Sequence, residues 1–164
     1  MRMGFSQSAY TMIESMVVPA LSQLVSAVRL RSSMTAMTSA LRLARYEAIR
    51  RNTRVVLCKS PNGKTCSSTG GWEQGWVVFF DDNNNLHADE METLLYVEPL
   101  LSAHIRITGN APVSDYVSYS SQGRAKLVSG AFQAGTLTVC ETSSGPTQAY
   151  QVIIKMIGNP RVEK

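Results

Sequence analysis

The first third of the chain carries apolar and small residues at the spacing of one helical face. From residue 30 these positions advance by steps of three and four, the period of an α-helix, and they are Leu30, Met34, Met37, Leu41, Ala44 and Ala48. The stripe continues upstream through Leu21, Leu24, Val25 and Val28. The opposite face carries Arg31, Thr35, Thr38, Arg42, Arg45 and Glu47. The pattern predicts a helix from about residue 20 to about residue 51, roughly 48 Å long, with Pro19 in its first turn.

After Asn52 the period becomes strand-like, and turn residues separate short apolar runs. The expected strands are 53–57, 75–80, 94–97, 104–108, 116–120, 135–140 and 150–157. In the second of them, Gly75 is expected to let the backbone bend while Trp76 packs inward. A helix followed by strands without intervening helices predicts an α+β fold, with an antiparallel sheet wrapped on the C-terminal half of the helix.

Composition adds an uneven charge to this picture. The 164 residues are 44% apolar and 17% charged with a net charge of +4, which fits one domain with a core and disfavours a disordered tail or a two-domain enzyme. Seven arginines and one acid, Glu47, lie between Arg29 and Arg54, whereas residues 73–98 hold seven acids and no lysine or arginine. The two regions are therefore expected to contact different partners.

The longest uncharged stretch is too short to form a transmembrane helix. It covers residues 15–28 and is interrupted by Pro19 and by polar residues, whereas a spanning helix needs about 20 mostly apolar residues. As it stands, the sequence is not expected to span a bilayer as a single helix.

Three cysteines are too few for a disulfide scaffold. Cys58 and Cys66 flank a step that contains Pro61-Asn62-Gly63, so a hairpin would bring their Cα atoms within bridging distance. Cys140 is an alternative partner for Cys58. In an oxidising compartment we expect one disulfide and one free thiol, with the first pairing favoured, whereas a cytosolic protein would keep the thiols free.

The sequence offers little catalytic chemistry. His87 and His104 stand alone, without the spacing of metal ligands, and no nucleophile or phosphate-binding motif is present. Asp81 and Asp82 precede three asparagines, a pattern more typical of a turn with Asx hydrogen bonds than of an acid/base pair or a cation site. We therefore predict no catalytic residue, no metal, no cofactor and no enzymatic activity.

Several blocks of sequence resemble a known family. Residues 10–18, YTMIESMVV, resemble the opening of type IV prepilins, FTLIELMVV. The later blocks are similar to the FimT/FimU/GspH group of minor pilins and pseudopilins, and they are ARYEAIRRN (44–52), the strand into Cys58, GWEQGWVVF (71–79), YSSQGR (119–124) and GTLTVC (135–140). Together they cover most of the chain in the order of the family.

The resemblance implies the pilin fold, in which a long N-terminal helix packs against an antiparallel β-rich head. It divides the chain into a leader peptide (1–9), a pilin helix (10–52) and a head (53–164). In the family, a prepilin peptidase cuts the leader and methylates the new N-terminus. Here Ala9 would precede the cut, Tyr10 would become the first residue, and Glu14 would pair with the terminal amine of a neighbouring subunit. A carboxylate in an apolar helix is costly unless it is paired, so it selects the subunit register.

The N-terminus departs from the family pattern at two points. Ala9 stands where the family usually has glycine. Val18 is followed directly by Pro19, where the family continues its apolar run, so we expect the membrane part of the helix to be truncated.

A second function within the family is DNA uptake during natural transformation, for which some members use a C-terminal GRxR tail. Here residues 158–161 read Gly-Asn-Pro-Arg. Arg161 and Lys164, with Arg124 as an addition, are the candidate DNA contacts, beside the acid Glu163. Phosphate binding needs several cations, so this tail is a weak DNA site.

The resemblance thus implies a minor pilin that acts at the tip of a type IV pilus, with DNA uptake or a type II secretion pseudopilin as alternatives. Its expected partners are other major and minor pilins, the prepilin peptidase and the inner-membrane assembly platform. Its expected location is the inner membrane and periplasm, then the pilus tip. We also expect the basic helix half, through Arg42 and Arg45, to meet acidic surface of residues 73–98 on its own head or on another subunit.

Overall fold

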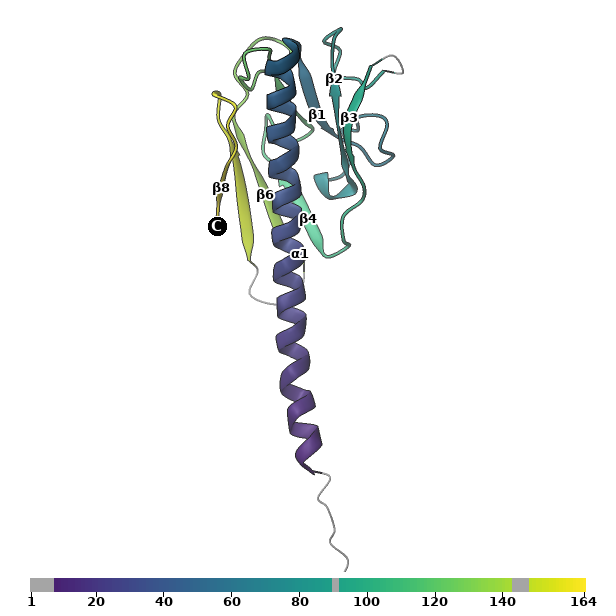
Figure 1. Cartoon of the computed structure of the whole chain (residues 1–164), viewed down its shortest axis with the longest axis vertical. Helices are drawn as coiled ribbons and strands as arrows, with labels where there is room; N and C mark the ends of the chain where they lie inside the picture. Colours follow the sequence, from purple (N-terminus) through teal and green to yellow (C-terminus); the bar gives the residue numbers. More distant parts are fainter. Residues whose placement is uncertain (1–7, 90–91, 143–147) are drawn as a thin grey trace, which may run out of the picture.

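The computed structural model describes residues 8–89, 92–142 and 148–164, with helix side chains from residue 21 onward. One long helix, α1 (Ser8–Arg51), runs along the molecule. Its C-terminal half packs into the head, and its N-terminal half extends away from it (Figure 1). At 1.5 Å per residue, these 44 residues span about 66 Å.

The helix begins earlier than predicted, and Pro19 lies inside it rather than in its first turn. Proline removes one backbone donor, but its fixed φ of about −65° is compatible with helical geometry. The helix therefore continues through this position, and the sequence-based boundary near residue 20 was wrong.

The predicted apolar stripe is buried where it meets the head. Met37, Leu41, Ala44 and Ala48 are completely buried, and Leu30 is 1% exposed. From Leu30 onward, the stripe therefore supplies the helix residues of the main hydrophobic core, as its spacing predicted.

Two residues assigned to the polar face are also buried, which corrects that part of the pattern. The Thr38 hydroxyl donates to the carbonyl of Met34 at 2.8 Å, so its polar atom is satisfied within the helix. The Glu47 carboxylate is paired with Arg50 at 2.7 Å and Arg51 at 3.7 Å. Local partners at helical spacing allow both polar groups to be buried.

The head contains two antiparallel sheets rather than the single sheet expected. The first has the order β3-β2-β1-β5, and its strands are β1 (Val55–Lys59), β2 (Trp76–Phe80), β3 (Leu94–Glu98) and β5 (Tyr116–Tyr119). Strands β1 and β2 are buried along their whole length because both faces are covered. One face joins the main core with α1, and the other packs under loop residues that include Leu86 and Ala88.

The second sheet has the order β4-β6-β7-β8. Its strands are β4 (Ile105–Gly109), β6 (Gly135–Glu141), β7 (Ala149–Ile154) and β8 (Arg161–Glu163). The sequence did not predict β8, and it predicted that β7 would continue to residue 157. The two sheets flank the upper half of α1 (Figure 1), and each contributes side chains to the main core.

A short 3-10 turn, η1 (Trp72–Gln74), precedes β2 and supplies a large core side chain. Trp72 and Trp76 are 1% and 0% exposed, so the inward packing predicted for Trp76 is confirmed. Gly75 between them has a φ of +108°, and a Cβ atom there would lie 2.6 Å from the Glu98 carbonyl oxygen. The bend predicted at this glycine is required both by its backbone conformation and by this close approach.

Within the described ranges, no helix combines the length and the hydropathy needed to cross a membrane.

Candidate assembly surface

The part of α1 just outside the head exposes a group of large apolar side chains. We call residues 21–29 the exposed helix segment. Leu21, Leu24, Val25 and Val28 are 45–62% exposed there, and Leu30 is the first buried residue among the helix side chains described, which begin at residue 21. Contiguous exposed apolar groups on a protruding helix are typical of a surface that is covered by another molecule.

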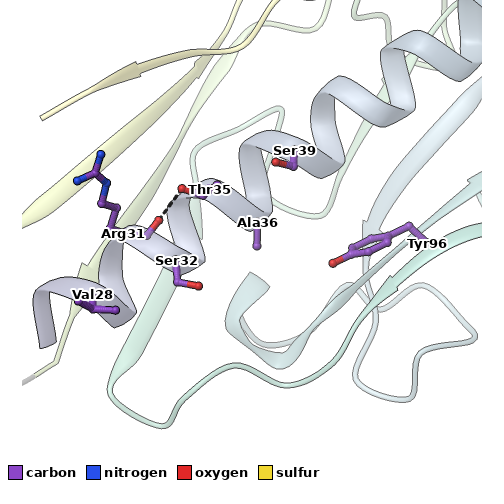
Figure 2. Close-up of a pocket in the computed structure, with 7 residues that line it drawn as sticks. All are labelled: Val28, Arg31, Ser32, Thr35, Ala36, Ser39 and Tyr96. Carbon is purple, nitrogen blue, oxygen red and sulfur yellow. Dashed lines mark hydrogen bonds between the residues drawn. The ribbon is translucent and has the colours of Figure 1, made fainter. Parts of the chain in front are cut away.

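A shallow groove begins at this segment and runs up one side of α1. It has a volume of about 600 Å³ and is lined by Val28, Arg31, Ser32, Thr35, Ala36, Ser39 and Tyr96. Small helix side chains form one wall, and Tyr96 reaches toward them from β3 (Figure 2). The Thr35 hydroxyl donates to the Arg31 carbonyl at 2.8 Å, so that polar group is satisfied within the helix. Small side chains allow another helix to approach closely, and this groove therefore has a shape suited to helix packing.

The groove has a polar end at β3. Tyr96 donates its hydroxyl hydrogen to the Glu98 carboxylate, and this bond raises the pKa of Tyr96 to about 12. The phenol therefore stays protonated at neutral pH. Sequence periodicity did not indicate Tyr96 as a surface residue, because the residue lies in an apolar run that reads as a buried strand.

A second hollow of about 320 Å³ lies lower on the helix. It is lined by Leu21, Ser22, Val25, Ser26, Arg29, His104 and Glu141. His104 is exposed and lies just before β4, so the strand expected at 104–108 begins one residue later than predicted. The exposed helix segment thus lies between two hollows: the groove that reaches the first sheet at Tyr96, and this one, which reaches the second sheet at Glu141.

The arginines between residues 29 and 54 have different surroundings. Arg29, Arg31 and Arg42 are exposed. Arg51 pairs with Glu47 and also lies over the Phe80 ring, 4.6 Å from its centre. Arg54 donates to Asn84 at 2.7 Å and to Ser118 at 2.9 Å. Arg50 and Arg51 at the end of the helix are exposed as well, but both pair with Glu47.

Arg42 and Arg45, predicted to act together, differ in position. Arg42 faces solvent, whereas the Arg45 Nε donates to the Gly123 carbonyl at 3.0 Å and is only half-exposed. Gly123 lies in the 120–124 turn, so Arg45 fastens this turn to α1. Arg45 therefore has a structural contact within the head, and Arg42 is the one available to a partner.

The acidic residues of 73–98 are largely occupied within the head. Glu73 accepts a hydrogen bond from the Ile107 backbone N–H at 3.0 Å, Asp81 and Glu92 accept from backbone N–H groups of the 81–92 loop, and Glu98 accepts from Tyr96. In the described part of the chain, no arginine of 29–54 forms an ion pair with these acids. Contact of these arginines with acidic surface of another subunit, the other alternative considered from the sequence, stays a prediction.

The loop after β2 has the Asx hydrogen bonds predicted from its sequence. Asn85 N–H donates to Asp81 Oδ1 at 2.9 Å and to Asn83 Oδ1 at 3.0 Å, and His87 N–H donates to Asn85 Oδ1 at 2.7 Å. Asp82 lies outside this set and accepts from the Thr53 hydroxyl at 2.8 Å.

The structure contains one disulfide, between Cys58 and Cys66, with a Cα–Cα distance of 5.5 Å. This is the first of the two pairings considered from the sequence. Cys140 is a half-buried free thiol. The bridge closes the loop between β1 and η1, which is held further by Lys59: its Nζ lies 2.8 Å from Asp115 Oδ1 and donates to the Gly70 carbonyl at 2.9 Å.

The predicted processing and pairing residues, Ala9, Tyr10 and Glu14, all lie within α1. Their side chains are outside the described part of the structure, so the roles expected for them stay predictions.

The candidate DNA contacts come from two parts of the head, the 120–124 turn and the segment at and after β8. Arg161 lies on β8 and pairs with Glu163 at 3.2 Å. Arg124 and Lys164 are exposed. The Gly158 expected to belong to a recognition tail has a φ of +83°, and a Cβ atom at this residue would lie 2.0 Å from the Gly123 carbonyl oxygen. A glycine is therefore required there by packing against the 120–124 turn.

Comparison with protein families gives one match, to the type II transport protein GspH, over residues 33–158. The chain belongs to the GspH family. The match begins in the buried half of α1 and covers every strand of both sheets except β8, so the family signature coincides with most of the helix-and-head unit described above.

Solved structures with the same fold include the type IV minor pilin FimU of Pseudomonas aeruginosa strain PAO1. In one crystal form, the GspH-family chain and FimU align with a TM-score of 0.61 at 13% identity, over 86% of this chain and 92% of FimU. A second crystal form gives a TM-score of 0.57 at 12% identity, over 82% and 92%. No curated protein matches the sequence.

These findings establish the general class of this GspH-family chain. Its family is that of the type II transport protein GspH, and its fold is that of a minor pilin, a class of structural subunits rather than enzymes. The expected α+β pilin fold is confirmed.

Proposed function

We propose that this chain is a minor pilin of a type IV pilus and that it acts at the pilus tip, where it helps to initiate assembly. The observation that carries the proposal is the exposed helix segment, whose apolar side chains are left uncovered by the chain's own head. Helices of other pilins are the expected cover, because the adjoining groove is lined by small side chains that allow close helix packing.

The charge distribution supports contact with a different subunit rather than with another part of the same head. Arg29, Arg31 and Arg42 are exposed on the helix, and the acids of residues 73–98 that the structure describes accept hydrogen bonds from other groups of the head. Surface cations contribute little to holding a complex together, but they steer association and fix its register. We propose that these arginines face acidic groups of a neighbouring pilin, and that Glu14 pairs with a terminal amine in the same assembly after cleavage between Ala9 and Tyr10.

Gene deletion and complementation in the source organism test the proposal. Deletion should abolish or sharply reduce surface pili in electron micrographs, and the wild-type gene should restore them. Val28→Glu should fail to restore pili, because a carboxylate would be buried against partner helices. Immunogold labelling should mark one end of each pilus.

Val128→Glu is the matched control, since Val128 is also exposed but lies on the head. It should restore pili fully. Full restoration by Val28→Glu would contradict packing through the exposed helix segment, and label along the whole shaft would contradict a tip position. Normal pili together with loss of secreted enzymes would instead assign the chain to type II secretion as a pseudopilin.

No structural observation favours the second candidate, DNA uptake, because the tail arginine Arg161 is already paired with an acid.

A further inference from the structure

Side chains of this chain cover two of the outer sheet edges in the head. At the edge of β4, the Ile107 N–H donates to the Glu73 carboxylate at 3.0 Å. At the edge of β5, the Ser118 N–H donates to the side-chain oxygen of the buried Gln133 at 2.9 Å. Backbone groups that are occupied in this way do not pair with a strand of another molecule.

The edge strand β3 has no comparable cover. It pairs with β2 on one side and ends the first sheet on the other. Within residues 8–89, 92–142 and 148–164, no hydrogen bond from outside β2 reaches the β3 backbone. Alternate residues of an antiparallel edge strand direct their N–H and C=O groups away from the sheet. β3 therefore presents unpaired donors and acceptors along its length of five residues.

The same strand exposes large apolar side chains. Leu94, Tyr96 and Val97 are 38–42% exposed, and Leu100, just beyond the strand, is 73% exposed. The strand contains neither lysine nor proline, the residues that commonly block pairing at a sheet edge. An open apolar edge of this kind is what recognition by strand addition requires.

Space for the side chains of an added strand lies beside β3. Tyr96 points from the strand toward Ala36 of α1 (Figure 2), and both residues line the groove of about 600 Å³. Side chains of a strand alternate between its two faces, so alternate residues of a strand paired with β3 would enter this groove. Ala36 and Ser39 are small and leave room there for an apolar side chain. The lower part of the groove, at Val28 and Ser32, stays available for helix packing.

Acidic residues surround this edge. Glu98 lies in β3, and Asp89 and Glu92 lie shortly before it. Their carboxylates accept hydrogen bonds from groups of the head, and such bonds leave the negative charge in place. Residues 73–98 contain no lysine or arginine that would compensate it.

Basic residues near β3 are fewer than these acids. Lys64 lies beside its outer face, since a Cβ atom on the preceding residue, Gly63, would lie 3.0 Å from Val97 Cγ1. Arg31 lines the groove, but its guanidinium points away from Tyr96 (Figure 2). The excess of negative charge favours a partner segment that carries lysine or arginine.

We propose that β3 binds an extended segment of another protein, which adds a fifth strand to the first sheet, inserts an apolar side chain beside Tyr96 and carries lysine or arginine near the acids of this edge. Main-chain hydrogen bonds supply the affinity in this mode of recognition, and the side chains that enter the groove supply the specificity. The proposal does not depend on the pilus-tip function, because it rests on the edge of the first sheet and not on the exposed helix segment.

Photo-cross-linking in the source organism tests the proposal. The photoreactive residue p-benzoylphenylalanine is placed in the full chain at Leu94, Tyr96 or Val97, and mass spectrometry identifies the partner residue that is cross-linked. We expect adducts within one segment of one partner, and this segment should contain lysine or arginine. The cross-linked residue should shift along the partner by as many positions as the probe shifts along β3, because paired strands keep a fixed register.

The same probe at Val128 is the matched control, since Val128 is also exposed but lies outside β3. It should give no adduct in this segment. Absence of adducts from all three β3 positions would overturn the proposal. Adducts that recur every three or four residues of a partner helix, or adducts to a second copy of this chain, would overturn it as well.

A synthetic peptide with the cross-linked sequence gives a second measurement. In isothermal titration calorimetry it should bind the purified chain with a Kd of about 1–100 μM. Methylation of the peptide N–H groups that face β3 should weaken binding at least about 10-fold, because carbonyl groups of β3 lose their donors. Methylation of the N–H groups that face away should change the Kd by less than about twofold. Equal weakening by both modifications would overturn pairing along this edge.

Discussion

The disulfide between Cys58 and Cys66 gives a stability prediction that can be worked out from the structure. The two cysteines are eight residues apart and close a loop of nine residues. In the chain-entropy treatment, such a loop removes unfolded-state freedom worth about 2.6 kcal/mol at 25 °C. Cys66→Ala should therefore lower the free energy of unfolding by about that amount, while the native loop stays anchored by Lys59.

Urea unfolding followed by tryptophan fluorescence is a suitable assay, because Trp72 and Trp76 are both buried in the main core. With a urea m-value of about 1–3 kcal/mol/M, the midpoint should fall by about 0.9–2.6 M. A reductant should produce the same fall in the wild type and no further fall in Cys66→Ala. The matched control is Cys140→Ala, which removes a half-buried free thiol and should change the unfolding free energy by less than about 0.5 kcal/mol.

Two results would refute this reasoning. If reductant leaves the wild-type midpoint unchanged, then the bridge does not form in the oxidised protein. If Cys140→Ala costs as much as Cys66→Ala, then Cys140 takes part in the bridge, which is the other pairing that the sequence allowed.

Five further substitutions test individual contacts. Gly158→Ala should lower stability by about 1–3 kcal/mol in the same urea assay, because φ is positive and the new Cβ meets backbone; an unchanged midpoint would contradict the close approach. Tyr119→Phe should leave stability unchanged or raise it by about 1–2 kcal/mol, since the hydroxyl is buried without a partner, and a clear loss would reveal an unseen hydrogen bond. Arg45→Ala should cost about 1–2 kcal/mol through its lost bond to the head, whereas Arg42→Ala should change the melting temperature little and instead weaken cross-linking to pilin partners. Gel-shift titration at low salt should give the same weak DNA binding before and after Arg161→Ala, because that arginine is already paired; a large, salt-sensitive loss would restore the DNA-uptake hypothesis.

The main features of the fold could be predicted because their signals are local. Leu30, Met37 and Leu41 repeat at helical spacing, and the buried strand at residues 76–80 follows an uninterrupted apolar run. Polar residues on the helix were harder to assign. Glu47 can be buried because two arginines, three and four residues further on, neutralise its charge. The sequence alone does not show that the head covers this side of the helix.

The division of the strands into two sheets could not be predicted, because it depends on pairing between distant segments. β4 pairs with β6 and not with the neighbouring β3 or β5, and no turn residue specifies that choice. β8 was missed because Arg161-Val162-Glu163 has a single apolar residue and reads as a polar tail.

The candidate site was only partly visible in the sequence. The sequence shows the arginines of the helix and the apolar stripe at residues 21–28. It does not distinguish Arg42 from Arg45, because the hydrogen bond from Arg45 to the Gly123 carbonyl joins residues far apart in the chain. The asparagines after Asp82 predicted a turn with Asx hydrogen bonds, and the structure has these bonds because the side chains involved are close together in the sequence.

The short strand β8 also bears on how the head avoids joining other heads edge to edge. If β7 were an edge strand, its unpaired backbone N–H and C=O groups could pair with a strand of another molecule, which commonly leads to aggregation. β8 covers that edge with only three residues, and its own outer edge carries the paired charges of Arg161 and Glu163. Residues 161–163 therefore protect this edge of the second sheet from pairing with another strand.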